Sequence, residues 1–232
     1  MIVAIDGPAG AGKSSVARAL AVRLGFRYLD TGAMYRALTW LALHNRVELD
    51  DVPALVHLAR EHPVEFGEGS GVFVGGHDVT AEIRSPEIDS AVPVVARHAE
   101  VREVMRERQR QLAEQGDSVI EGRDIGEIVA PHAELKIWLY ADPEVRAARR
   151  HAERDGMEVE VLADEMRRRD ERDAQNTHRA DDAVELDTTF LDLEQVIDRI
   201  ETLVNERVEA AAATGVSRSS GSPGSPGLER HS

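Results

Sequence analysis

Short apolar runs alternate along this chain with longer segments in which apolar residues recur every three or four positions. The first run, Ile2–Ile5, is β-branched at three of its four positions and precedes Asp6-Gly7-Pro8, which is typical of a buried parallel strand. Further strands are predicted at Tyr28–Asp30, Ser118–Glu121, Leu135–Tyr140 and Ala183–Leu186. Helices are predicted over Lys13–Leu24, Met34–His44, Val52–Arg60, Ala99–Gln115, Pro143–Arg154, Val159–Ala174 and Leu193–Val208. This alternation predicts an α/β fold of three layers around a parallel sheet.

Two stretches depart from this alternation. The segment Pro63–Val79 holds five glycines around two short β-rich runs, which predicts a small antiparallel appendage. From about Ala212 the chain is rich in Gly, Ser and Pro, a composition that buries too little apolar surface to offset its ordering entropy. We therefore expect one domain over residues 1–211 and a disordered tail over residues 212–232.

Composition and charge narrow the range of functions. The 232 residues include 28 basic and 43 acidic ones, and the net charge of −15 argues against a broad basic surface for nucleic acid or anionic membranes. The chain has no cysteine, which excludes disulfides, thiolate metal sites and cysteine catalysis. No apolar run reaches the roughly 18 residues of a membrane span, and the first residues lack a signal-peptide pattern. We expect a cytoplasmic protein.

The strongest chemical signal is a glycine-rich loop between the first predicted strand and the first predicted helix. It matches G-x-x-x-x-G-K-[ST] over Gly7, Pro8, Ala9, Gly10, Ala11, Gly12, Lys13 and Ser14, followed by Ser15. Backbone N–H groups and a helix N-terminus converge on phosphate oxygens in such a loop. We expect Lys13 to reach the β- and γ-phosphates of ATP and Ser14 to bind Mg²⁺. Lysine is rare here, and we expect no role for the other one, Lys136.

A phosphate-binding loop does not by itself identify the acceptor of the phosphoryl group. Many ATPases and GTPases carry a strand that ends in an Asp near Mg²⁺, and we do not expect that pattern where Ser118–Ile120 leads into Glu121. An Asn-Lys-x-Asp motif for guanine is also missing. These absences favour a kinase that acts on a small molecule.

Three further motifs accompany the loop. They are Asp30-Thr31-Gly32-Ala33-Met34-Tyr35-Arg36, Glu121-Gly122-Arg123-Asp124-Ile125-Gly126 and Arg168-Arg169-Asp170-Glu171-Arg172-Asp173. With them the chain closely resembles the bacterial cytidylate kinases, from residue 2 to about residue 205. The resemblance implies a P-loop kinase fold with an inserted part, at about residues 60–97, that binds the nucleoside monophosphate, and a helical lid at about residues 143–181. It also implies Mg²⁺-dependent transfer of a phosphoryl group from ATP to CMP or dCMP by a monomer.

The same resemblance implies which residues hold the phosphates. Arg36 and Arg123 match family positions that grip the CMP phosphate, and the fork of a guanidinium group suits a phosphate. Arg169 lies in the lid segment and is expected to stabilise charge on the phosphoryl group in transfer. Lys13, Arg123 and Arg169 are thus the expected catalytic residues.

Residues that recognise the nucleoside are implied in the same way. Asp124 matches the position that reads the base, and a carboxylate prefers the N4 amino donor of cytosine to the O4 acceptor of uracil. Arg102 matches a second base-reading position, and Asp173 matches a position that binds the ribose hydroxyls. Thr31 and Tyr35 line the same pocket by resemblance.

The chain departs from the family pattern at two positions. Asn176 stands where the family usually has an Arg, for which Arg179 is the nearest replacement, and Pro93 stands where a Ser often contacts the base. Proline has no backbone or side-chain donor for that contact.

Structural readings of the same residues stay open at this point. Arg102 could belong to a solvated helix face with its arginine neighbours, Arg169 could form surface ion pairs, and Tyr35 could be core. Asp124 could cap the turn that follows it. The rival functions are a P-loop kinase for UMP, AMP or a small alcohol such as shikimate, and an ATP-binding module without catalysis.

Overall fold

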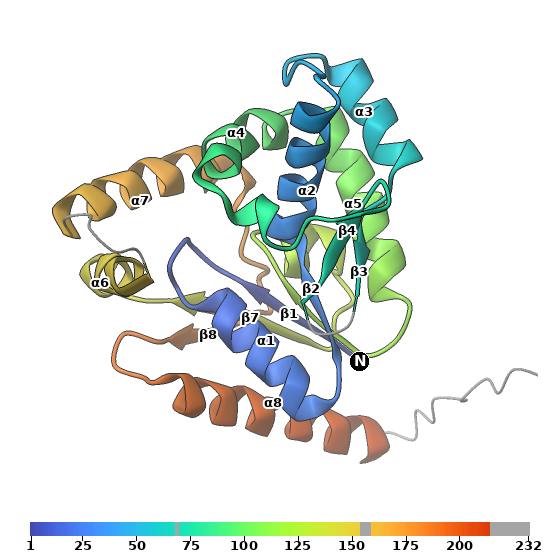
Figure 1. Ribbon diagram of the computed structural model, residues 1–232. Helices are drawn as coiled ribbons and strands as arrows, with labels where there is room; N and C mark the ends of the chain where they lie inside the picture. The colour runs from blue at the N-terminus through green and yellow to red at the C-terminus, as the bar shows by residue number, and fades with distance from the viewer. Residues whose placement is uncertain (68–69, 154–158, 214–232) are drawn as a thin grey trace, which may run out of the picture.

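A five-stranded parallel sheet forms the centre of the protein (Figure 1). The computed structural model describes residues 1–67, 70–153 and 159–213, without the side chains of 153, 159, 160, 165 and 169. The strands follow the order β2-β6-β1-β7-β8. Their bounds are Ile2–Asp6 for β1, Arg27–Asp30 for β2, Ser118–Glu121 for β6, Leu135–Tyr140 for β7 and Val184–Asp187 for β8. Because all neighbours are parallel, the carboxyl ends of these strands share one edge of the sheet.

Alternate residues of the central strand β1 build the two hydrophobic cores. Val3 and Ile5 pack with α1 (Lys13–Leu24) and α8 (Leu193–Ala213) on one face of the sheet. Ile2 and Ala4 pack on the other face with α2 (Thr31–His44) and α5 (Ala99–Ala113). These layers give the three-layer α/β fold that the hydrophobic pattern predicted.

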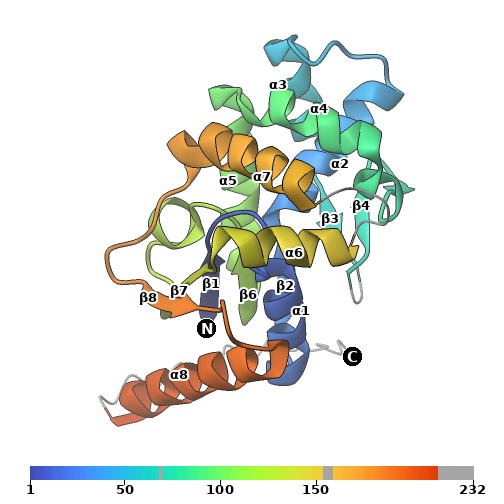
Figure 2. The same cartoon turned by 90° about the vertical axis from the view of Figure 1, so that its left-hand side faces the viewer.

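Most of the remaining helices lie beyond the carboxyl ends of the sheet, and three short strands lie beside α2 (Figures 1 and 2). Residues 52–96 form α3 (Val52–Glu61), β3 (Glu65–Phe66), β4 (Val72–Val74), β5 (His77–Asp78), the 3₁₀-helix η1 (Glu82–Arg84) and α4 (Pro86–Ala96). Strands β3, β4 and β5 are antiparallel, as the glycine-rich segment predicted. Helices α6 (Pro143–Glu153) and α7 (Val159–Asp173) pack against each other, and the 3₁₀-helix η3 (Ala174–Asn176) follows.

Helix α4 and a π-helix are among the elements that were not expected from the sequence. Helix α4 contains Pro93, and it forms because Ser85 caps its first turn while Ile88 and Val95 are buried. A π-helix, η2 (Ile125–Val129), follows β6. Its first N–H groups bind a distant side chain, described below.

Two predictions about particular positions are corrected. Helix α8 continues to Ala213, so it includes the first two residues of the tail expected over residues 212–232; the rest of that tail lies outside the described part. Lys136 has a structural role that we did not expect. Its Nζ donates to Asp182 Oδ1 at 2.9 Å, its side chain is 9% exposed, and its aliphatic stem packs against Gly126 of the π-helix.

Candidate active site

The glycine-rich loop connects β1 to α1 at the carboxyl edge of the sheet. Gly7 has φ = 148° and Gly10 has φ = 73°, both in the region that favours glycine. A Cβ atom at Gly7 would overlap the carbonyl oxygen of Leu139, and one at Gly10 would overlap the end of Met166. The loop therefore needs glycine to pass closely between β7 and α7.

Lys13 and Ser14 begin α1 and face different partners. Lys13 is buried, and its Nζ donates to the carbonyl oxygen of Pro8 at 2.8 Å within the same loop. Ser14 is exposed, as is Ser15, and the Ser14 hydroxyl donates to Glu121 Oε2 at 2.8 Å. The expected nucleotide-binding residues thus lie around one loop, with an acidic side chain of β6 against it.

That acidic side chain corrects our expectation that no strand-end carboxylate serves this loop. Glu121 ends β6, directly beside β1, and is buried; it also accepts a hydrogen bond from the Tyr28 hydroxyl. Burial, followed by the nearby charge of Asp30, raises the pKa of Glu121. The sequence did carry a signal for this contact, namely a carboxylate at the end of a buried strand. The longer side chain of Glu reaches Ser14 from this position, so the residue type need not be Asp.

A second buried carboxylate, Asp6, ends the central strand. Its Oδ1 accepts from the N–H of Ile125 at 2.9 Å and its Oδ2 from the N–H of Gly126 at 2.8 Å. Burial raises the pKa of Asp6 to about 6, against the lowering effect of the two N–H groups. Asp6, which we had not singled out, therefore fastens the start of the π-helix to the strand that carries the phosphate loop.

Arg123 joins the phosphate loop to the end of α7. Its Nη1 donates to the carbonyl oxygen of Gly7 at 2.9 Å, and its Nε and Nη2 both lie 3.3 Å from Asp173 Oδ2. The carbonyl of Arg123 accepts from the N–H of His178 at 3.0 Å. Two predicted site residues, Arg123 and Asp173, are thus brought together at the phosphate loop.

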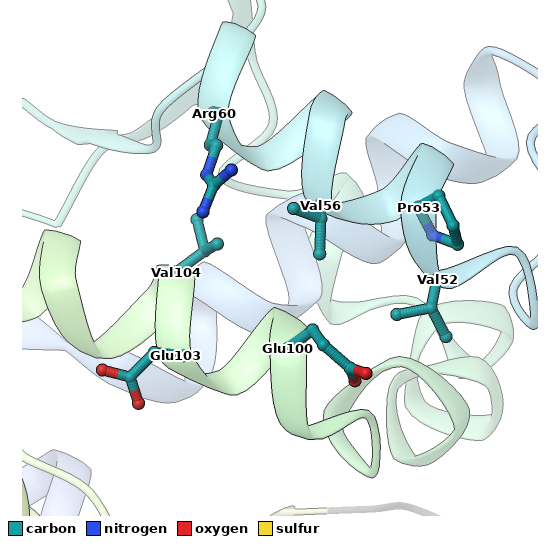
Figure 3. A pocket seen from close by; sticks show the side chains of 7 residues that line it. All are labelled: Val52, Pro53, Val56, Arg60, Glu100, Glu103 and Val104. Atoms are coloured by element: carbon teal, nitrogen blue, oxygen red, sulfur yellow. The ribbon is translucent and has the colours of Figure 1, made fainter.

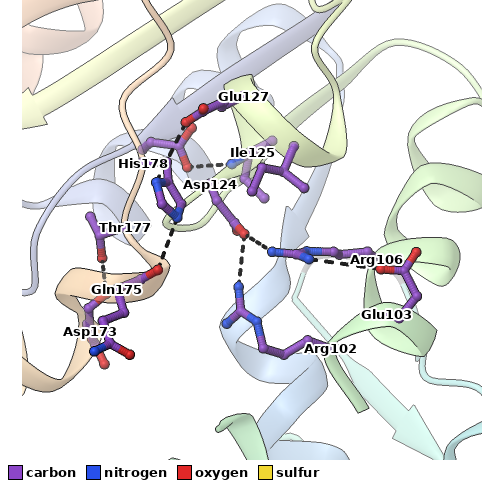
Figure 4. Close-up of polar contacts among 12 residues, drawn as sticks. Arg102, Glu103, Arg106, Asp124, Ile125, Glu127, Asp173, Gln175, Thr177 and His178 are labelled. Atoms are coloured by element: carbon purple, nitrogen blue, oxygen red, sulfur yellow. Dashed lines mark hydrogen bonds and ion pairs between the residues drawn. The ribbon is translucent and has the colours of Figure 1, made fainter. Parts of the chain in front are cut away.

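Asp124, the next residue, lies between two arginines of α5 (Figure 4). Its Oδ2 is 3.0 Å from Arg102 Nη2 and 2.8 Å from Arg106 Nη2. Burial raises the pKa of Tyr35 to about 12, while the charge of Arg102 lowers it and that of Asp124 raises it. The structure therefore joins Arg102 to Asp124 within range of Tyr35, and it favours the inward reading of Arg102 over a solvated face.

Thr31 and Arg36 are both on α2 but have different surroundings. The buried Thr31 hydroxyl donates to the carbonyl oxygen of Glu121 at 2.7 Å, which ties α2 to the end of β6. Arg36 Nη1 lies 2.5 Å from Asp89 Oδ1 of α4 and donates to the carbonyl oxygen of Ile83 at 3.1 Å. Arg36 is thus held by η1 and α4, whereas Arg123 is held by the phosphate loop and α7.

The lid segment contacts the phosphate loop through residues that we had not predicted. Arg146 of α6 is buried, and its Nη1 donates to the carbonyl oxygen of Ala9 at 2.9 Å and to Asp170 Oδ2 at 2.6 Å. Asp170 of α7 accepts from the N–H of Ala9 at 3.3 Å. The side chain of Arg169 lies outside the described residues.

The possible replacement for the arginine missing at Asn176 points elsewhere. Arg179 Nη1 pairs with Glu185 Oε1 of β8, and both side chains are 49% exposed. Arg179 is therefore directed to the sheet edge at β8 in this structure.

A separate groove of about 440 Å³ lies between α3 and α5 (Figure 3). It is lined by Val52, Pro53, Val56, Arg60, Glu100, Glu103 and Val104. None of these residues belongs to the phosphate loop, to the segment after β6 or to α7. We therefore give the groove no part in phosphate chemistry.

Comparisons with known proteins identify the family. The family model for cytidylate kinase matches residues 3–206. The chain belongs to the cytidylate kinase family. A cytidylate kinase from Geobacillus sp. (strain WCH70) is 51% identical over 217 residues, covering 89% of this chain and 97% of that protein. The cytidylate kinase of Geobacillus kaustophilus is 49% identical with the same coverage.

A solved structure has a fold similar to that of this member of the cytidylate kinase family. An uncharacterized protein from Eubacterium ventriosum superposes with a TM-score of 0.51 at 17% identity, covering 89% of this chain and 98% of that one. The chain is thus a kinase with a P-loop fold. Within the described residues, no helix has the length and apolar character to cross a membrane.

Proposed function

We propose that the chain transfers the γ-phosphoryl group of ATP to CMP or dCMP, giving ADP and CDP or dCDP. One observation carries this proposal: Arg123 and Asp124 are consecutive, and one contacts the phosphate loop while the other lies in the arginine cluster of α5. Two adjacent residues therefore connect a site for the donor phosphates to a site suited to a base. A module that only binds ATP has no need of this second site.

The donor phosphates bind at the loop between β1 and α1. Its backbone N–H groups and the N-terminus of α1 attract phosphate oxygens, and Lys13 leaves the Pro8 carbonyl for the β- and γ-phosphates. Arg146, already against Ala9, holds the lid close to this loop.

The residues around Ser14 fit Mg²⁺. A hydroxyl and a carboxylate oxygen 2.8 Å apart are the hard oxygen ligands that this ion prefers, and burial makes the charge of Glu121 costly without a cation. Ser14 and Glu121 would hold Mg²⁺ together with ATP oxygens. The ion supplies neutralisation of phosphate charge.

The acceptor nucleotide occupies the other side of Arg123. We propose that Arg36 and Arg123 exchange their present acceptors, Asp89 and Asp173, for the CMP phosphate. Asp173 then binds the ribose hydroxyls, while Asp124 and Arg102 read the base, with Thr31 and Tyr35 lining the pocket.

Transfer requires no general base, because the acceptor is an anionic phosphate oxygen at neutral pH. This oxygen forms a bond to the γ-phosphorus while the bond from that phosphorus to the β,γ-bridging oxygen breaks, and ADP leaves. We propose that Lys13, Arg123 and Arg169 neutralise charge on the transferring group. The lid, at about residues 143–181, and the insert, at about residues 60–97, close over the two nucleotides.

A panel of acceptors tests this function. Purified protein with Mg·ATP should release ADP much faster with CMP or dCMP than with UMP, AMP or shikimate in a coupled assay. ADP release with shikimate or AMP ahead of CMP would contradict the acceptor, and ATP binding with no acceptor would favour a binding module. We also propose a cytoplasmic monomer, for which light scattering after size-exclusion chromatography tests the oligomeric state.

A further inference from the structure

Arg106 is a second arginine on the carboxylate that we propose to read the base. Arg102 and Arg106 are four residues apart on α5 and so share a helix face. Both place Nη2 on the same oxygen, Asp124 Oδ2, at 3.0 Å and 2.8 Å. The three side chains are only 13%, 19% and 12% exposed for Arg102, Arg106 and Asp124. This is a shielded cluster with two positive charges and one negative charge (Figure 4).

The arrangement leaves a particular atom for a ligand. Within the part of the chain that the structure describes, no hydrogen bond reaches Asp124 Oδ1, while Oδ2 accepts two. With Oδ2 fixed from two sides, the carboxylate cannot rotate freely about its last torsion. Oδ1 is therefore a fixed acceptor, which suits the N4 amino group of cytosine and opposes the O4 of uracil.

Arg106 also retains an unused donor in this cluster. Its Nε is buried and finds no acceptor among the described residues. A buried N–H without an acceptor is costly. Its presence beside the carboxylate favours a site that a bound group completes.

We propose that Arg106 is a specificity-determining positioning residue, which locks Asp124 so that its free oxygen selects cytosine over uracil. The proposal rests on the proposed function, and it assigns the selection to two arginines on one carboxylate. Arg106 acts through Asp124, and it leaves Arg102 with donors to spare for the acceptor edge of the base. Asp124 and Arg102 can then recognise the base together, although Pro93 stands where the family often has a serine.

The alternative is an ion pair that only stabilises α5. Among the described residues, Arg106 makes one other ion pair, since its Nη1 lies 3.9 Å from Glu103 Oε2, whose side chain is 57% exposed. A pair of that length with an exposed partner is weak. The shorter and more shielded contact is with Asp124, so the two readings differ in what Arg106 should do to the substrates.

The test compares Arg106→Leu, Arg106→Lys and a matched control, Arg108→Leu. Arg108 is on the same helix, and its Nε donates to the carbonyl oxygen of Val64 at 3.2 Å, away from Asp124. For each variant we would measure kcat and KM with CMP and with UMP, the KM for ATP, and CMP binding by calorimetry without ATP. Thermal unfolding would show that each variant is folded.

The proposal predicts a change in the ratio of the two substrates. In Arg106→Leu the kcat/KM for CMP should fall about tenfold, which corresponds to about 1.4 kcal/mol, through weaker CMP binding. The kcat/KM for UMP should stay or rise, because a rotating carboxylate no longer opposes O4. Arg106→Lys, which keeps a charged donor, should restore part of the ratio. Arg108→Leu should leave the ratio unchanged, and the KM for ATP should stay the same in all three variants.

Other outcomes overturn the proposal. Equal losses for CMP and UMP in Arg106→Leu would show a structural role, and an unchanged ratio in both Arg106 variants would show no role in selection. If Arg106→Leu does not fold, the ratio in Arg106→Lys decides. A wild-type protein that does not prefer CMP would instead contradict the proposed function, and this result separates the two failures.

Discussion

Asp6 offers a sharp test of how the active site is held together. The substitution Asp6→Asn keeps the shape of the side chain but replaces one of its two acceptor oxygens with an NH₂ group. The N–H of Ile125 or of Gly126 then faces a donor instead of an acceptor. The change should therefore loosen the start of the π-helix and, with it, the adjacent Arg123 and Asp124.

The free energy of unfolding should respond differently from the activity: relative to the wild type, the variant should gain stability as the pH rises. Burial raises the pKa of Asp6 from its ordinary value of 3.8 to about 6, so the folded protein binds this proton more tightly than the unfolded chain. The contribution of Asp6 to stability is thus full below about pH 4 and is lost as the pH rises to about 6, a difference of about 3 kcal/mol. Asparagine carries no charge and avoids that loss.

Urea unfolding of the wild type and of Asp6→Asn between about pH 4.5 and 7.5 measures the difference. We expect the variant to gain on the wild type as the pH rises, by about 2 kcal/mol over that range, and to lose about tenfold in kcat/KM, on the order of one charge-assisted hydrogen bond. Asp50→Asn, at a side chain that is 73% exposed, is the matched control and should differ from wild type by no more than about 0.5 kcal/mol at any pH. An Asp6→Asn variant that loses stability equally at every pH, or that keeps full activity, would refute the reasoning.

Three further predictions follow from the same site. Lys13→Ala should lower kcat by about two orders of magnitude or more, in line with the loss of charge stabilisation at the transferring group, with an unchanged circular dichroism spectrum; near-normal turnover would contradict the role of the loop. Glu121→Gln should raise the Mg²⁺ concentration for half-maximal activity about tenfold, because one carboxylate charge at Ser14 is lost, whereas Glu114→Gln, at the exposed end of α5, should not; equal Mg²⁺ dependence of both variants would argue against a metal at Ser14. Removal of residues 214–232 should leave kcat and KM unchanged in the coupled assay, and a large loss would show that the tail takes part.

Local patterns were enough to predict the elements that position the loop. The run Ile2–Ile5, the helical spacing of Lys13–Leu24 and the glycines between them each indicate one conformation, and the structure has a strand, a loop and a helix there. The parallel sheet follows from the alternation of strands and helices. Such features depend on neighbours within a few residues, so the sequence displays them directly.

Features that depend on distant partners were not predictable. The first N–H groups of the π-helix Ile125–Val129 bind Asp6, which is more than a hundred residues earlier in the chain. The contacts of Glu121 with Ser14 and of Lys136 with Asp182 likewise join separate segments. The periodicity of apolar residues carries no information about which polar side chains meet. Helix α4 was not predicted because it contains Pro93, and burial of apolar residues on the same helix stabilises it.

The overall charge of −15 also describes the active site poorly. Around Asp124 two guanidinium groups face one carboxylate, and Arg123 and Arg146 lie against the phosphate loop. We propose that these few arginines, which are held by defined acceptors, bind the anionic nucleotides. The average over the chain reflects its exposed surface.

The role of Asp124 is tested most directly by the ratio of kcat/KM for CMP to that for UMP in the wild type and in Asp124→Asn. We expect a strong preference for CMP in the wild type, because the free carboxylate oxygen accepts from N4. We expect this preference to fall at least tenfold in Asp124→Asn, because an amide can donate to the O4 of uracil. Equal use of CMP and UMP by the wild type, or an unchanged ratio in the variant, would contradict the claim that this carboxylate reads the base.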